Sequence, residues 1–288
     1  MAKTFRIPKD EPLLNIASYA RGGPRAGGRL TPSQIEQIRL TVNRAPEAVV
    51  KVLPRNSNDL KAVGKHIDYI GRRGNLELEG DDGERLRGRV GAALLEDWDL
   101  DIEDVRRQGN LAAASKRSPP KIVHKLMFSM PPGTPPHKVL TAVRNFAREE
   151  FYGQHRYAMV LHTDEPHPHV HVVLKARSEQ GYRLNIRKAT LRDWRQRFAT
   201  HLRELGVNAN ATERMLRAQP QGSLSNGHYR LRQRIPEGMS CIRGKQSERE
   251  ISSLEEHSSQ SIAIQSGWRK VSADLKRFGE RQLADQVD

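Results

Sequence analysis

Histidines are concentrated in one short segment of this 288-residue chain, HTDEPHPHVHVV, which holds four of the eleven histidines. Side chains alternate between the two faces of a β-strand, so His169 and His171 project from one face while Val170 and Val172 turn to the core. The DEPHP turn folds the preceding strand back and brings His162 beside them. Three imidazoles that converge at a strand edge predict a metal site, with His162, His169 and His171 as its ligands.

Two other residues of this segment are candidates for supporting roles. His167 lies in the turn and is the weakest candidate ligand, whereas Asp164 is expected to orient a ligand and to take part in catalysis. Histidines without cysteine accept several divalent ions, so the residues alone do not choose between Mg²⁺, Mn²⁺ and Zn²⁺. The alternative is a Pro/His turn at the surface that binds nothing.

The positive charge of the chain is concentrated in one part of the sequence. Lys and Arg outnumber Asp and Glu by 49 to 34, and residues 121–236 hold 20 basic against 8 acidic side chains. Such a segment predicts a surface for a polyanion, most simply nucleic acid, although a solvated helix face remains the alternative. We expect a single strand to follow the basic residues after the histidine strand: Lys175, Arg177, Arg183, Arg187 and Lys188.

A metal beside a positive surface suggests phosphate chemistry, which needs an attacking group. No serine elbow is present, and the single cysteine, Cys241, lies in a polar tail. Tyr69, in KHIDYIGRRG, stands near the end of a predicted helix and is followed by Arg72 and Arg73. Their guanidinium groups can hold a phosphate next to the phenol and favour its ionised form. Tyr69 is therefore the candidate nucleophile, against the alternative of a half-buried helix tyrosine.

The elements that must position these residues are predicted within residues 48–220. Strands are expected at AVVKVLPR, NLELE, KIVHKLMFSM, YAMVLHT and HVHVVLKAR. Helices are expected over 59–73, 138–151 and 190–205, the last capped by Thr190 and ended by Gly206, with a weaker one over 90–107. Strands joined by hairpins between packed helices predict an α+β domain, in which helices flank a largely antiparallel central sheet.

The two ends of the chain have a different composition. Residues 1–47 are predicted to form an N-terminal arm with one helix from Pro32 to about Val42. Residues 221–288 are predicted to form a polar, partly disordered tail with one helix near 266–284. The sequence has no stretch apolar enough for a membrane span and no signal peptide, so we expect no membrane insertion and a cytoplasmic location.

Three segments of the sequence resemble the motifs of a known family. HTDEPHPHVHVV resembles the third motif of the P-type mobilisation relaxases, which include the agrobacterial T-DNA border endonuclease. These are HUH endonucleases, named for a His–hydrophobic–His pattern that matches His169, Val170 and His171 here. DYIGRRGNLELE resembles their first motif, and KLMFSMPPGT the second, with Ser129 at the place associated with DNA contact. The resemblance covers about residues 48–218, with the motifs in the expected order.

The resemblance implies an HUH-type palm fold and a single-tyrosine DNA strand transferase. Tyr69 would nick an origin of transfer and keep a 5′-phosphotyrosyl link, with Mg²⁺ or Mn²⁺ held by the three histidines. The implied partners are single-stranded DNA at that origin, accessory relaxosome proteins and a type IV secretion coupling protein. The protein would act in the donor cell and could pass on with the DNA. A rolling-circle replication initiator, a transposase and a non-catalytic basic DNA-binding protein are the alternatives.

Overall fold

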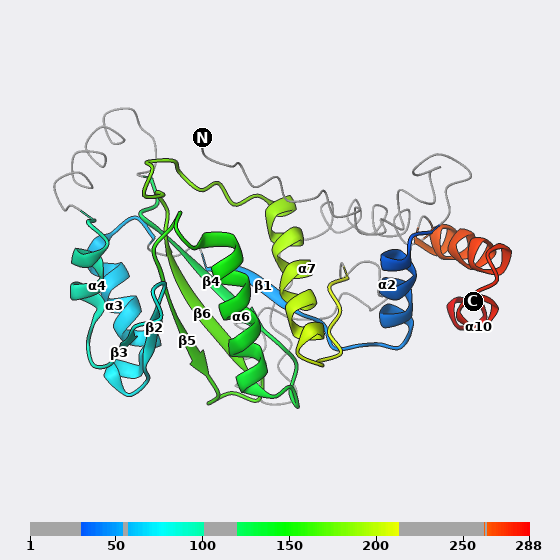
Figure 1. Cartoon of the computed structure of the whole chain (residues 1–288), viewed down its shortest axis with the longest axis horizontal. Coiled ribbons are helices and arrows are strands. Elements are labelled where there is room, and N and C mark those ends of the chain that lie inside the picture. Colours follow the sequence, from blue (N-terminus) through cyan, green and yellow to red (C-terminus); the bar gives the residue numbers. More distant parts are fainter. Residues whose placement is uncertain (1–29, 54–56, 101–119, 213–261, 263) are drawn as a thin grey trace, which may run out of the picture. The chain divides into compact units, whose positions relative to one another are not determined.

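The computed structural model describes residues 30–53, 57–100, 120–212, 262 and 264–288. The chain divides into two compact units (Figure 1), one formed by residues 45–211 and the other by residues 1–44 together with 212–288. All the residues that the sequence singles out for chemistry lie in the first unit, except Cys241, which lies outside the described residues. None of the described helices is long and apolar enough to cross a membrane.

The larger unit is built on a six-stranded sheet in which every neighbouring pair of strands is antiparallel. The spatial order is β1-β4-β6-β5-β2-β3, so β6 is a central strand. The prediction of an α+β fold with an antiparallel sheet is therefore confirmed. The strands are β1 (Val49–Leu53), β2 (Leu78–Gly80), β3 (Arg85–Leu86), β4 (Val123–Ser129), β5 (Tyr157–His162) and β6 (His169–Lys175).

Helices cover the two faces of this sheet, and each face supplies alternate residues of the strands to a core. Helices α6 (Pro136–Phe151) and α7 (Lys188–Glu204) pack on the face that carries Phe128, Val170 and Val172. Helices α3 (Leu60–Ile70) and α4 (Gly91–Asp97) pack on the face that carries Val160 and Val173. Because β6 alternates, His169 and His171 share the second face with Val173.

Several of the predicted helix boundaries are wrong. Helix α3 stops at Ile70 rather than at Arg73, because Arg72 and Arg73 have φ angles of 50° and 58° and form the short 3-10 turn η1 (Arg72–Gly74). Helix α7 begins at Lys188, so Thr190 is not its N-cap. The Thr190 hydroxyl instead accepts a hydrogen bond of 3.3 Å from the backbone N–H of Arg187. The weaker helix expected over 90–107 is the shorter α4, which ends at Asp97, and residues 101–107 fall outside the described part.

The smaller unit is helical. The predicted helix α2 (Pro32–Val42) is present, and the Thr31 hydroxyl caps it by accepting from the Gln34 N–H. In place of the single helix expected near 266–284, the chain forms a helix over 264–277 and then α10 (Arg281–Val287). Gly279, with a φ of 92°, lies between them. Apolar side chains from all three helices form the core of this unit.

Candidate active site

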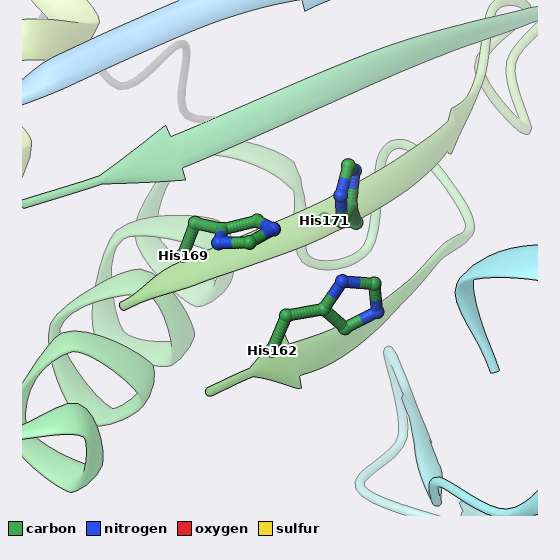
Figure 2. Close-up of side chains that lie close together, drawn as sticks. All are labelled: His162, His169 and His171. Atoms are coloured by element: carbon green, nitrogen blue, oxygen red, sulfur yellow. The ribbon is translucent and has the colours of Figure 1, made fainter. Parts of the chain in front are cut away.

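Three imidazoles meet where β5 ends and β6 begins (Figure 2). His162 lies directly opposite His169 in the antiparallel register, and His171 is two residues further along β6 on the same face. The ring centroids are 5.0 Å apart for His162 and His169, 4.8 Å for His162 and His171, and 5.1 Å for His169 and His171. One ring nitrogen of each lies within 4.8 Å of the others. The structure thus brings together the three predicted ligands.

Backbone carbonyl groups fix the protonated nitrogen of two of these rings. Nε2 of His162 donates to the carbonyl of Ile70 at 2.6 Å, and Nδ1 of His169 donates to the carbonyl of His167 at 2.9 Å. Each ring therefore keeps its lone pair on the other nitrogen, Nδ1 in His162 and Nε2 in His169. His167 is itself exposed and supports the cluster through its backbone.

The cluster suits a divalent metal ion. Nδ1 of His171 is buried and is one of three buried side-chain nitrogens, among the described residues, that have no hydrogen-bond partner. Burial, with smaller effects of His162 and His169, lowers the pKa of His171 to about 3, and burial also lowers the pKa of His162. Neutral imidazole is the form that binds metals. In their neutral forms, the three rings can therefore hold such an ion through the ring nitrogens that converge here.

The helix that carries Tyr69 is attached to this cluster. Tyr69 is the next-to-last residue of α3, and the last residue, Ile70, provides the carbonyl that holds His162. The Tyr69 side chain is 65% exposed, so the alternative of a half-buried helix tyrosine is wrong. Tyr152 and Tyr182 are exposed to a similar extent. The attachment of α3 to His162, rather than exposure, distinguishes Tyr69.

Arg72 connects the tyrosine to the histidines. Its guanidinium carbon lies 5.5 Å from the centre of the Tyr69 ring, and its Nη2 lies 3.2 Å from Nδ1 of His162. The same guanidinium forms an ion pair with the exposed carboxylate of Asp164, and this hydrogen bond lowers the pKa of Asp164. Asp164 is therefore connected to His162 by Arg72, which contacts both residues. Arg73 follows Arg72 in the same turn.

Ser129 lies in the same row of the sheet as two of the histidines. As the last residue of β4, it pairs with His169, which in turn pairs with His162 across β6 and β5. The preceding residue on this face, Met127, pairs with His171. The second predicted motif therefore borders the histidine cluster.

His66, which no motif in the sequence singles out, lies on α3 one turn before Tyr69. Its ring is nearly perpendicular to that of His171, with centroids 6.4 Å apart. Burial, and to a smaller extent the charge of Lys125, lowers the pKa of His66 to about 4. The signal available in the sequence was its spacing of three residues from Tyr69, which places the two on neighbouring positions of a helix surface.

The five predicted basic residues that follow the histidine strand lie away from the histidine cluster. Lys175 ends β6, six residues or about 20 Å from His169 at the rise of a strand. Arg177 and Arg183 follow that end and pair with each other in a β-bridge, and Arg183 donates to the carbonyl of Lys121. Arg187 and Lys188 lie at the start of α7, which packs on the opposite face from His169. The structure does not bring these five residues to the histidines.

A comparison with protein families finds one match to part of the chain. Residues 81–207 match the model of the family described as Relaxase: MobA/VirD2-like, nuclease domain. The matched segment begins after Tyr69 and includes Ser129, Asp164 and the three histidines. No curated protein matches the chain significantly. Residues 81–207 are therefore similar to the nuclease domain of the MobA/VirD2-like DNA relaxases, which supports a relaxase of the HUH superfamily.

Proposed function

We propose that this protein nicks one DNA strand by transesterification, with Tyr69 as the nucleophile. The observation that supports this role most directly is the hydrogen bond from His162 to the carbonyl of Ile70, next to Tyr69. This hydrogen bond joins the end of α3, which carries Tyr69, to the three histidines that can bind a metal. Tyr69 is also exposed, as an attack on a large DNA substrate requires.

In the proposed reaction, the phenol of Tyr69 loses its proton and its oxygen attacks the phosphorus of a phosphodiester. The new bond joins the tyrosine oxygen to phosphorus, and the bond from phosphorus to the 3′ oxygen breaks. The leaving 3′ oxygen takes up a proton and becomes a free hydroxyl. The resulting 5′-phosphotyrosyl bond is again a phosphodiester, so the reverse attack by a 3′-hydroxyl reseals a strand.

Several residues of the chain support this step. His162, His169 and His171 would hold a divalent ion, for which we propose Mg²⁺ or Mn²⁺ and which would supply positive charge to stabilise the phosphate oxygens in the transition state. Arg72 places a guanidinium beside the phenol. Ser129 and Arg73 border the same region and are proposed contacts to the DNA backbone.

The proposed biological role is conjugative mobilisation. The substrate would be single-stranded DNA at an origin of transfer, and the partners would be accessory relaxosome proteins and a coupling protein of a type IV secretion system. The reaction would take place in the cytoplasm of the donor cell, before passage of the protein with the DNA. The family match favours this role over a replication initiator or a transposase. The position of the nick distinguishes the three.

The test is covalent capture of DNA. The full chain is incubated with Mn²⁺ and end-labelled single-stranded oligonucleotides that tile the DNA around its gene, and the products are separated on a denaturing gel. We expect a protein–DNA band that EDTA abolishes. Tyr69→Phe removes the nucleophilic oxygen and should lower adduct formation by at least about 1,000-fold.

Tyr182→Phe is the matched control. Tyr182 is 78% exposed and lies beyond the other end of β6, so its phenol should not be needed for the adduct. An adduct that forms with Tyr69→Phe at the normal rate would show that another group is the nucleophile. If the unaltered chain binds all the oligonucleotides but captures none, the protein is a DNA-binding protein and not a strand transferase.

A further inference from the structure

Both ring nitrogens of His162 already have a neighbour that can form a hydrogen bond. Nε2 donates to the carbonyl of Ile70, which accepts and cannot donate, so the proton of the neutral ring sits on Nε2. Nδ1 then carries the ring's available lone pair, and Nη2 of Arg72 lies 3.2 Å from it. A guanidinium can only donate, so Arg72 uses that lone pair.

A metal ion at the histidine cluster needs the same lone pair. His169 and His171 can each bind a metal without giving up a hydrogen bond. In His169 the carbonyl bond uses Nδ1 and leaves Nε2, and in His171 the buried Nδ1 has no partner. At His162, a metal and an arginine cannot both bind Nδ1. The positive charges of a metal ion and of the Arg72 guanidinium, both placed beside Nδ1 of His162, would also repel each other.

We propose that Arg72 and the metal ion compete for Nδ1 of His162, so that metal binding moves Arg72 to the substrate phosphate beside Tyr69. The second half of this statement rests on the proposed function, whereas the competition stands on the geometry of His162. Arg72 is then the residue that makes the site ready for the phosphate only after the metal has entered.

The surroundings of Arg72 allow such a movement. The Nη2 atom that contacts His162 also forms the ion pair with Asp164, whose side chain is 53% exposed. The Tyr69 ring lies 5.5 Å away on the same guanidinium. A guanidinium that keeps Asp164 and leaves His162 therefore stays next to the phenol, where two of its N–H groups can meet a phosphate as a pair.

The competition is tested by the affinity of the full chain for Mn²⁺, measured by titration calorimetry without DNA. Arg72→Gly removes the guanidinium, and glycine suits the φ of 50° at this position, so the turn should be kept. We expect Arg72→Gly to bind Mn²⁺ about tenfold more tightly than the unaltered chain, because the competing and repelling guanidinium is gone. Arg87→Ala removes an exposed arginine that is paired with Glu77, and it should leave the affinity unchanged.

Asp164→Asn distinguishes competition for Nδ1 of His162 from an effect of loosening the turn that carries Arg72. It breaks the ion pair with Arg72 but leaves the guanidinium beside Nδ1 of His162, so the affinity for Mn²⁺ should not rise. Equal or weaker binding by Arg72→Gly would overturn the competition. A similar tenfold gain in Asp164→Asn would also overturn it, because the cause would then be release of the turn.

The movement to the phosphate is tested by the rate of covalent adduct formation at saturating Mn²⁺. Arg72→Gly should form the adduct at least about tenfold more slowly, although it binds the metal more tightly. A normal rate would overturn the role at the phosphate. If the unaltered chain forms no adduct while Arg72→Gly still gains metal affinity, the proposed function fails and the competition at His162 stands.

Discussion

The two ends of β6 carry the two features that stand out in the sequence, and they differ in how the fold uses them. At its first residues, His169 and His171 join His162 from β5 and the end of α3 in one cluster. At its last residue, Lys175 begins a basic segment, and its ammonium group forms an ion pair with Glu179 four residues further along the chain. One end gathers three imidazoles with converging nitrogens, whereas at the other end the charged side chains of Lys175 and Arg183 are held by Glu179 and by the carbonyl of Lys121.

This difference shows which sequence signals carry information about distance. A run of basic residues predicts a positive segment. It does not predict which residues lie across the sheet from that segment. Alternation along a strand, combined with a tight turn, fixes which side chains share a face and a row. The second kind of signal placed the histidines correctly, whereas the first kind suggested a path that begins about 20 Å away.

The largest effect is expected at the histidine end. His169→Ala together with His171→Ala removes two of the three proposed ligands, so Mn²⁺ binding should be lost. Covalent adduct formation should fall by at least about 1,000-fold, because the charge on the phosphate is no longer stabilised. Salt-dependent binding of single-stranded DNA, measured by fluorescence anisotropy, should remain mostly intact.

His137→Ala is the control for this pair, since His137 is exposed on α6 and outside the cluster. Thermal unfolding of both variants checks that the fold is kept. If the double variant still binds Mn²⁺ and forms the adduct, the histidines are structural, and the contrast between the two ends of β6 has no catalytic meaning.

The part of the site that the sequence predicted is the part that depends on short-range geometry. The period of two along HVHVV and the turn before it place three histidines on one face without knowledge of the rest of the fold. The position of His66 depends on how α3 packs across the sheet, which no local pattern determines. The contact of Arg72 with His162 depends in addition on two left-handed residues that ended the predicted helix early.

A second prediction concerns a histidine near the other end of β6. His124 pairs with Leu174, and its Nε2 contacts the carbonyl of Leu184 at 3.1 Å. Burial is the main cause that lowers its pKa from 6.5 to about 4. The unfolded chain therefore takes up a proton below pH 6.5 while the folded chain does not, so the stability from this group is present above pH 6.5 and is lost as the pH falls toward 4.

His124→Gln keeps a donor for the carbonyl of Leu184 and removes the titration. In EDTA, the loss of unfolding free energy between pH 7 and pH 5 should be about 1–2 kcal/mol smaller in this variant than in the unaltered chain. Urea unfolding at the two pH values measures it. An unchanged loss would mean that burial does not lower the pKa of His124 in the folded chain.

The smallest effect is expected from the basic end itself. Arg187→Gln with Lys188→Gln removes two charges at the start of α7. If both groups contact phosphates of a bound single strand, the slope of log affinity against log salt should fall by about 1.4, and the affinity near 0.1 M salt by several-fold. The single-turnover rate of adduct formation at saturating protein should not change, because these side chains lie far from Tyr69.

Arg85→Gln with Arg87→Gln removes the same charge from β3 and the residue that follows it, and separates a DNA contact from a change in net charge. An equal loss of slope in both pairs would mean that the basic end attracts DNA only through the overall field of the protein. A slower single-turnover rate in the α7 pair alone would place the basic end within reach of the nick. The start of α7 would then lie closer to Tyr69 in the complex with DNA than in the structure of the chain alone.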